Sequence, residues 1–549
     1  MIKWIGKSAN TKLTLLLLIT FFISCLKLGS WGLTETSEAR YGQISKEMYI
    51  SKDYVHPKLL GIHHFHKPLL TYHITALGYA IFGVNEFGAR FFLQIALIIQ
   101  LLLVYHISLI LFKDKNIALN TSIIYFSLPL VLISVRNLTT DAYLNTCILS
   151  SIFFWLKFQQ NNHKKYFIYL FFICLGLIMN IKGPVGILFS VIFILIYKRI
   201  FKFNYKIDFH VITGFFIFIG MSFFWLALLL KEDPLLFNYF LDEQILKRIT
   251  TNSYHRAKPI WYYLLVLPLA ILPWLIPSVQ GIFTNIKTTL EKNKTKKLLA
   301  FNIIAIFLIF SLFKTKLILY VLPISSYIAI LSSKILSEYK NERLKKYSIF
   351  LIILTVLLIV TFFLLPTIDH SFSINYKILS ALTLALLLLF LFIYKRKDTM
   401  LSKVVYSGYL FGIVLLLGST LFFNSNEIKI NSVKPILNFI ENNASLKDRK
   451  VVIYDYLLPS ASFYSNENIY TISNGHNTVK RDVRFEENDG WKNYLIDVKT
   501  PEGITQLDSL LKKDIVLITR KNRPLADNLQ SKQTKLNNEI IFGKWTLFY

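Results

Sequence analysis

The most regular feature of the sequence is a series of apolar runs, each near 20 residues long and separated by short polar connections. A helix needs about 20 residues to cross a hydrocarbon core of about 30 Å. The runs therefore predict thirteen membrane-spanning helices, near residues 13–31, 87–112, 117–135, 142–160, 166–181, 184–201, 209–230, 259–281, 298–313, 316–335, 348–366, 377–394 and 404–423.

Composition agrees with a bilayer environment. Hydrophobic residues make up 54% of the 549 positions, and the formal net charge is +29. Such a charge is also typical of nucleic-acid-binding proteins, but here the Lys and Arg residues fall in short clusters between apolar runs and form no recognised nucleic-acid motif. Basic connections that face the cytoplasm explain the charge better, and no nucleic-acid partner is expected.

The basic clusters also predict an orientation. With a retained first helix and the N-terminus in the cytoplasm, the clusters in residues 198–206, 287–297, 340–346 and 395–403 all fall on cytoplasmic connections. Thirteen spans then place the C-terminus on the outer side of the membrane.

Two polar regions stand apart from the apolar runs. The first outer loop, residues 32–86, has apolar residues at helical spacing over 39–48 and 69–82, which predicts two helices along the membrane surface. The tail, residues 424–549, shows strand patterns over 451–456, 468–472, 514–519 and 540–548. The predicted fold is an all-α polytopic membrane domain over 1–423 with a small α/β periplasmic domain over 424–549.

Eight short motifs occur in order between about residues 30 and 330. They are Glu38-Ala-Arg40-Tyr41, Lys52-Asp53-Tyr54 with Pro57, Phe65-His66-Lys67-Pro68, Phe82 to Arg90, Leu138-Thr-Thr-Asp141, Lys182-Gly183-Pro184, His255-Arg256-Ala-Lys-Pro259 with Trp261, and Lys314-Thr-Lys316 with Tyr320 and Pro323. In this order and spacing they resemble the GT-C membrane glycosyltransferases, specifically the lipid A aminoarabinose transferase and its relatives in the dolichyl-phosphate-mannose–protein mannosyltransferase superfamily.

The resemblance implies a GT-C fold with about 13 transmembrane helices. It also implies an enzyme that takes its sugar from a polyprenyl-phosphate donor such as undecaprenyl phosphate. The acceptor would lie on the periplasmic side and be lipid A, another glycolipid or glycan, or a protein.

Transfer from such a donor needs cations that stabilise the leaving phosphate. The resemblance places the family's phosphate-contacting lysine at Lys67. Lysines at helix ends also extend to the interface without any catalytic role, which is the alternative for the other basic positions. The further candidates for donor binding are Arg40, Tyr41, Lys182, Arg256, Lys314, Lys316 and Tyr320.

A hydroxyl acceptor also needs a carboxylate to remove its proton, whereas a phosphate acceptor is already anionic. Glu38 and Asp141 are the leading candidates, although Asp141 would also serve as a helix N-cap. Ser37 stands where the family has the first residue of an acidic pair, so the nearby Glu35 is a candidate too.

The histidines suggest a metal hypothesis. Relatives can hold a divalent cation with the glutamate before the motif lysine and a later histidine, and in this sequence that glutamate is His66. A zinc ion held by His66 and His255 is chemically reasonable. The alternative is that these histidines donate hydrogen bonds to sugar or phosphate.

Two other functions use the same lipid carriers. A transporter or flippase would place ionisable residues near the bilayer midplane on broken helices related by repeats, whereas these span interiors lack charges and no repeat is evident. An oligosaccharide ligase or polymerase would transfer a longer glycan.

Overall fold

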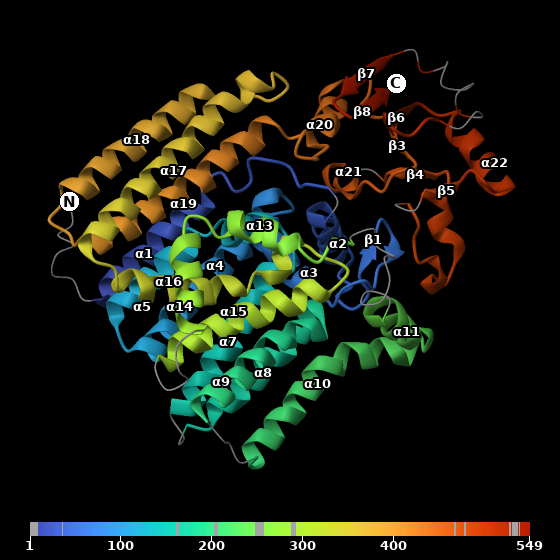
Figure 1. Cartoon of the computed structure of the whole chain (residues 1–549). Coiled ribbons are helices and arrows are strands. Elements are labelled where there is room, and N and C mark those ends of the chain that lie inside the picture. The colour runs from blue at the N-terminus through green and yellow to red at the C-terminus, as the bar shows by residue number, and fades with distance from the viewer. Residues whose placement is uncertain are drawn as a thin grey trace. The chain divides into compact units, whose positions relative to one another are not determined.

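The computed structural model describes residues 9–35, 37–160, 164–202, 207–246, 257–286, 293–465, 468–476, 479–525, 529, 536 and 538–549. The chain forms two compact units (Figure 1). We call Met1–Leu28, His66–Thr71 and Arg90–Phe422 the membrane unit. We call Gly29–Phe65, Tyr72–Ala89 and Phe423–Tyr549 the loop–tail unit.

The membrane unit is built from helices. They are α1 (Ala9–Cys25), α4 (Glu86–Phe112), α5 (Lys115–Phe126), α6 (Pro129–Arg136), α7 (Asp141–Gln160), α8 (Tyr166–Lys182), η1 (Pro184–Gly186), α9 (Ile187–Phe201), α10 (Phe209–Glu232), α11 (Leu235–Asn238), η2 (Tyr239–Leu246), α13 (Tyr262–Ala270), α14 (Leu275–Ile286), α15 (Lys294–Leu312), η3 (Ile318–Val321), α16 (Ile324–Ser337), α17 (Asn341–Ile368), α18 (Tyr376–Lys395) and α19 (Met400–Ser425).

Among the described residues, seven helices are long and apolar enough to cross a membrane, or up to eight if a bent pair counts as one span. They are α4, α9 with η1, α10, α15, α17, α18 and α19, and the bent pair is α5 with α6. Four shorter apolar helices lie in α1, α8, α14 and α16. The predicted multi-pass helical architecture is confirmed, while the count of thirteen spans stays a prediction.

Prolines divide two of the expected spans. The run over 117–135 breaks into α5 and α6, which are bent by 59°, and Pro129 opens α6. The run over 259–281 divides into α13 and α14, and Pro273 lies in the connection. Proline lacks the amide N–H of a helix interior but fits the first helical turn, so an apolar run with an internal proline need not be one straight helix.

Buried polar side chains join the helices of the membrane unit. Arg136, at the end of α6, donates from Nη1 to the Ser24 carbonyl at 2.5 Å and from Nη2 to the Thr420 hydroxyl at 2.6 Å. Arg90 of α4 donates to the Leu28 carbonyl at 3.0 Å and is 0% exposed. The final carbonyls of a helix have no intrahelical partner, so these two arginines satisfy groups at the end of α1 and just beyond it.

The loop–tail unit combines helices with two sheets. Its elements are α2 (Ser37–Ser51), β1 (Lys58–Leu59), β2 (Ile62–His63), α3 (Leu70–Phe82), α20 (Lys434–Asn442), β3 (Lys450–Tyr454), α21 (Pro459–Tyr464), β4 (Tyr470–Ser473), η4 (Val483–Phe485), η5 (Asp489–Asn493), β5 (Leu495–Asp497), α22 (Pro501–Leu510), β6 (Ile515–Arg520), β7 (Glu539–Phe542) and β8 (Trp545–Phe548).

The larger sheet has the strand order β5-β4-β3-β6-β8-β7. Its first four strands are parallel, and β8 and β7 complete it antiparallel (Figure 1). Alternate residues of β3 enter two apolar clusters, with Ile453 packed near α20 residues and Val452 near α22 residues. Apolar clusters on both faces explain why the parallel strands read as continuous hydrophobic runs.

Helix α2 of the first loop packs against α21 of the tail within this unit. The Gln43 amide donates to the Ser462 hydroxyl at 3.0 Å, and Lys46 donates to the Ser462 carbonyl at 2.9 Å. The Tyr464 hydroxyl accepts from the Leu33 amide at 2.7 Å. These bonds join segments more than 400 positions apart, a pairing that hydrophobic periodicity does not predict.

The predicted α/β tail and the two first-loop helices are present. The pattern over 540–548 is a hairpin of two strands, β7 and β8, with Gly543 at a φ of 60° in the turn. The three-residue β5 and the β1–β2 hairpin were missed because such short strands carry little periodicity. The domain division at residues 423 and 424 and the placement of α2 and α3 on a membrane surface stay predictions.

Gly408 of α19 provides a test of packing in the membrane unit. A Cβ at this position would overlap the Trp274 ring, whose indole N–H donates to Ser127 at 2.7 Å. We expect Gly408→Ala to lower stability by about 1–3 kcal/mol, the usual range for overpacking. Gly220→Ala on α10 is the control because nothing lies within 4 Å of the added carbon. Equal thermal unfolding of both variants in detergent would contradict this packing.

Candidate functional site

Three candidate residues from three different motifs meet in the membrane unit. Asp141 begins α7 and Lys182 ends α8, and Lys182 Nζ lies 2.5 Å from Asp141 Oδ1. The same ammonium lies 4.4 Å from the centroid of the Tyr320 ring. Helix α8 stops after Lys182 because Gly183 adopts a φ of 79° and Pro184 opens the next turn. The Lys-Gly-Pro motif thus holds a lysine at a helix C-terminus.

The charges of this group suit their positions. Asp141 lies at a helix N-terminus and Lys182 at a helix C-terminus, so each side chain opposes the partial charge of its own helix end. Their side chains are 9% and 12% exposed, which weakens screening by solvent. The Tyr320 ring adds a cation–π contact to the ammonium. We call Asp141, Lys182 and Tyr320 the ion-pair group.

In the membrane unit, the segment that ends the His255–Pro259 motif lies beside the Lys314–Lys316 motif. Ala257 and Thr315 form an isolated antiparallel bridge, and the Lys258 amide donates to the Lys314 carbonyl at 3.1 Å. Lys316 is 2% exposed, and its ammonium donates to the Lys258 carbonyl at 3.0 Å and to the Phe313 carbonyl. Lys316 therefore ties the two segments together, which is a structural role. The candidates His255 and Arg256 lie outside the described residues.

Lys67 and His66 lie between β2 and α3 and are both half-buried. The His66 ring centroid is 6.3 Å from that of Tyr239. Among the described residues, no group of three or more His, Cys, Asp or Glu side chains is placed to hold a metal ion. Since His255 is outside that part of the chain, the His66–His255 zinc site stays a prediction.

In the loop–tail unit, Glu38 has a clear local role. Its Oε2 accepts from the Thr34 amide at 2.9 Å and from the Thr34 hydroxyl at 3.0 Å, and the residue is 1% exposed. The side chain thus closes the turn that leads into α2. Tyr41, one turn further along, packs its ring 5.5 Å from Tyr72. A catalytic role for Glu38 stays a prediction.

Glu35 is a candidate carboxylate whose acidity is altered by burial. Its Oε1 accepts from the Ser460 amide at 2.8 Å, while its Oε2 is buried without a hydrogen-bond partner among the described residues. Burial raises its pKa to about 7, against the lowering effect of the Ser460 hydrogen bonds and the charges of Arg40 and Lys544. A carboxyl group that titrates near neutral pH suits proton transfer.

Arg481 of the tail interacts with Arg40 and Glu47 of the first loop, and the motifs did not reveal it. Burial and the charge of Arg40 lower the pKa of Arg481 to about 9, and Glu47 opposes them. Glu47 accepts from the Leu60 amide at 2.7 Å and the Gly61 amide at 3.0 Å. The Nε atoms of Arg40 and Arg481 are buried with no hydrogen-bond partner among the described residues.

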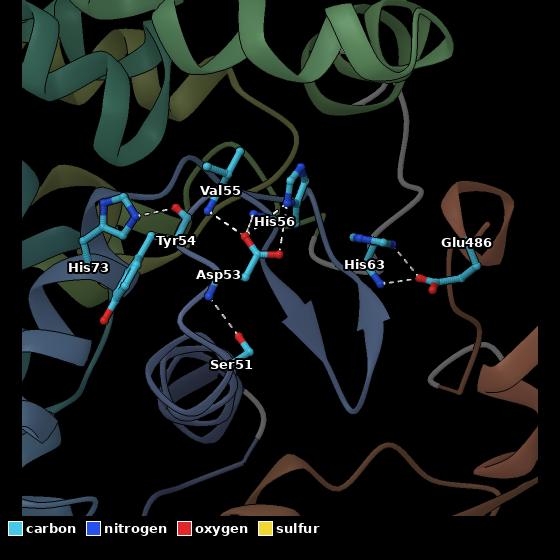
Figure 2. Close-up of polar contacts among 8 residues, drawn as sticks. All are labelled: Ser51, Asp53, Tyr54, Val55, His56, His63, His73 and Glu486. Carbon is cyan, nitrogen blue, oxygen red and sulfur yellow. Dashed lines mark hydrogen bonds and ion pairs between the residues drawn. The ribbon is translucent and has the colours of Figure 1, made fainter. Parts of the chain in front are cut away.

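Two of the first-loop histidines, His56 and His63, pair with carboxylates (Figure 2). His56 Nδ1 is 3.0 Å from Asp53 Oδ2, and His63 Nδ1 is 2.8 Å from Glu486 Oε1. Glu486 also accepts from the His63 amide at 2.6 Å, so it joins β2 to the segment after η4. Burial lowers the pKa of His63, and Glu486 raises it. Figure 2 also shows His73 turned to the Tyr54 carbonyl, at 2.8 Å.

The chain is similar to known proteins in both sequence and fold. Residues 66–225 match the family model described as dolichyl-phosphate-mannose-protein mannosyltransferase. An undecaprenyl phosphate-alpha-4-amino-4-deoxy-L-arabinose arabinosyl transferase of Photorhabdus laumondii is 28% identical over 327 residues, 58% of either chain. The protein of the same name from Wigglesworthia glossinidia brevipalpis is 31% identical over 57% of this chain and 56% of its own length.

Two solved structures share the whole fold. The ArnT protein from Cupriavidus metallidurans bound to undecaprenyl phosphate superposes with a TM-score of 0.74 over 98% of both chains, at 17% identity. Its apo form gives a TM-score of 0.75. The predicted GT-C fold is therefore confirmed. The sequence matches span less than two thirds of the length of the curated relatives.

The raised pKa of Glu35 predicts a pH-dependent stability. A carboxyl group whose pKa is raised on folding adds stability below its unfolded pKa of 4.5, and this contribution is lost as pH rises through about 7. Glu35→Gln, which stays neutral, should match the wild type at pH 4.5 and exceed it at pH 8 by up to roughly 3 kcal/mol. Thermal unfolding across this range measures the difference.

Glu441→Gln on α20 is the matched control, because Glu441 is exposed in the same unit. It should leave the pH dependence unchanged. If Glu35→Gln gave the same dependence of stability on pH as the wild type, the raised pKa of Glu35 and the burial that causes it would be contradicted.

Proposed function

We propose that this chain is a glycosyltransferase of the bacterial inner membrane that moves a sugar from a polyprenyl-phosphate donor to an acceptor on the periplasmic side. The ion-pair group, in which Asp141, Lys182 and Tyr320 meet, is the observation that carries the proposal. It supplies a cation for the leaving phosphate and a carboxylate for the acceptor. The shared fold with a protein solved in complex with undecaprenyl phosphate supports this class of donor.

The reaction breaks one bond and forms one. An acceptor oxygen attacks the anomeric carbon of the sugar, and the bond from that carbon to the phosphate oxygen breaks. The electron pair of the broken bond stays on the polyprenyl phosphate, where positive charge stabilises it. Lys182 and Lys67 are the proposed cations, and the Tyr320 ring holds the Lys182 ammonium in place.

The Asp141–Lys182 pair offers a coupling between donor binding and base activation. A phosphate that approaches Lys182 competes with Asp141 for the same ammonium. Once Lys182 contacts the phosphate, the Asp141 carboxylate is released to accept the proton of a hydroxyl acceptor. A phosphate acceptor needs no such base, so the effect of Asp141 on the rate depends on the acceptor.

The substrates are proposed from the relatives. Their names specify undecaprenyl phosphate and 4-amino-4-deoxy-L-arabinose, so we propose an undecaprenyl-phosphate sugar as donor. Lipid A is the proposed acceptor, with another glycolipid, a glycan or a protein as the other outcomes. The proposal includes a cytoplasmic N-terminus and a periplasmic tail, the orientation that the basic clusters favour.

The assay uses purified chain in nanodiscs with radiolabelled polyprenyl-phosphate sugar and candidate acceptors. Lys182→Met should lower kcat/KM by about 100-fold or more, because a lost charge contact to the leaving group affects mainly the transition state. Lys165→Met is the matched control. Lys165 is the N-cap residue of α8, at the opposite end of the helix from Lys182, and its Nζ lies 3.2 Å from Asp208 Oδ2. The control therefore also removes a lysine–aspartate ion pair from α8.

A buried Asp141 without Lys182 can destabilise the protein by several kcal/mol, so loss of folding must be separated from loss of function. The double variant Asp141→Asn with Lys182→Met removes both charges and should fold while remaining inactive. Wild-type transfer by Lys182→Met, or equal losses in Lys182→Met and Lys165→Met, would contradict the proposal.

A further inference from the structure

In the tail sheet, the order in which the chain adds parallel strands reverses between β3 and β6. From β3 the chain proceeds to β4 and then β5 on one side, and it returns to place β6 on the other side of β3. In open α/β sheets, ligands bind beyond the carboxyl ends of the strands at such a switch point. Here these ends are Tyr454 of β3 and Arg520 of β6.

Two arginines and two aromatic rings gather at this switch point. The Arg523 guanidinium carbon lies 4.7 Å from the Tyr456 ring centroid, and that of Arg520 lies 5.0 Å from it. The Trp545 ring is 5.1 Å from Tyr456, and Trp545 pairs in register with Arg520. Stacking on an aromatic ring fixes the orientation of a guanidinium group, and Arg523 Nη2 also lies 3.4 Å from His476 Nε2.

Positive charge exceeds negative charge around Tyr456. Burial raises the pKa of the Tyr456 hydroxyl, and neighbouring cations lower it. Those cations are Arg520, Arg523 and Arg40, while Glu35 opposes them at Tyr456 and the Asp455 carboxylate acts on Arg523. Arg520 forms no ion pair with any residue in the described part of the chain. An excess of guanidinium groups with few carboxylates favours an anionic ligand.

A buried donor without a partner lies next to the arginines. Trp545 is 1% exposed, yet its Nε1 has no hydrogen-bond partner among the described residues. More than nine in ten buried polar groups in proteins have such a partner. Because Trp545 pairs in register with Arg520, this unpartnered indole N–H lies at the same end of the sheet.

A cavity of about 340 Å³ is lined by the last residues of β6, by the segment that follows them and by residues of β7 and β8. Its volume is within the usual range for small-molecule sites. Besides the positive side chains it has hydroxyl and carboxylate groups that suit the hydroxyls of a sugar. Its lining includes Thr519, Arg520, Lys521, Arg523, Glu539 and Thr546.

We propose that the carboxyl ends of β3 and β6 form a binding site for a phosphorylated saccharide, with Arg520 and Arg523 on the phosphate and the lined cavity on the sugar. The phosphate is assigned to the arginines because guanidinium groups bind it bidentately. This proposal rests on the proposed function in one respect: the saccharide is taken to be the phosphorylated headgroup of the acceptor glycolipid.

The test measures binding of glucose 1-phosphate, glucose and inorganic phosphate to the full chain in nanodiscs of uncharged lipid, by calorimetry and without donor. The wild type should bind glucose 1-phosphate more tightly than either fragment. Arg520→Gln and Arg523→Gln should each weaken this binding about tenfold or more, the loss typical of a charge-assisted hydrogen bond. Arg520→Lys keeps the positive charge but loses the planar, two-pronged guanidinium group. Its affinity for glucose 1-phosphate should therefore lie between those of the wild type and Arg520→Gln.

Arg449→Gln is the matched control, since Arg449 immediately precedes β3 at the amino end of the same sheet. It should bind as the wild type does, and thermal unfolding shows whether each variant is folded. Equal affinity for inorganic phosphate and glucose 1-phosphate would overturn the saccharide assignment. No binding by the wild type, or equal binding by Arg449→Gln and a folded Arg520→Gln, would overturn the site.

The result is separable from transfer. Lys182→Met should bind glucose 1-phosphate with wild-type affinity while it fails to transfer sugar. If the wild type transferred no sugar but showed Arg520-dependent binding, the proposed function would fail and the binding site would stand. If the wild type transferred sugar but showed no Arg520-dependent binding, the binding site would fail and the proposed function would stand.

Discussion

Charged side chains enclosed by the apolar helices need partners within the protein, and this requirement shapes two places in the membrane unit. A buried group left unpaired costs several kcal/mol in hydrocarbon. Arg136 and Arg90 meet the requirement at the end of α1, where their guanidinium groups donate to the carbonyls of Ser24 and Leu28. Arg136 also binds Thr420 of α19, so one side chain joins the first and last helices of the unit. These bonds fix the point from which the first loop departs.

The same requirement explains the ion-pair group. Lys182 and Asp141 are nearly buried, and each is tolerated because it is the other's partner and because each opposes the charge of its helix end. A site with this composition suits an anionic ligand, since a phosphate can take the place of Asp141 beside the Lys182 ammonium and leave the carboxylate available to accept a proton. Catalysis by charge stabilisation then needs little reorganisation.

Sequence patterns predicted the helices well where apolar runs are long, as in α4, α17 and α19, because burial in lipid leaves a strong signal. They failed where a proline divides a run, as at Pro129, and where a strand has only three residues, as in β5. Motif order identified Asp141, Lys182 and Tyr320, which the structure brings together. Arg481, Arg520 and Tyr456 escaped notice because the tail has no matching motif. Glu35 meets Ser460 across 425 positions, and no local pattern encodes such a contact.

The central claim is that this chain breaks the bond between a sugar and a polyprenyl phosphate. The most direct measurement reconstitutes the purified chain in proteoliposomes with a polyprenyl-phosphate sugar and lipid A, and follows both lipids by mass spectrometry. A glycosyltransferase yields free polyprenyl phosphate and an acceptor heavier by one sugar residue, in equal amounts. If the donor instead crossed the bilayer with its sugar still attached and no acceptor gained mass, the chain would be a transporter and the account would be wrong.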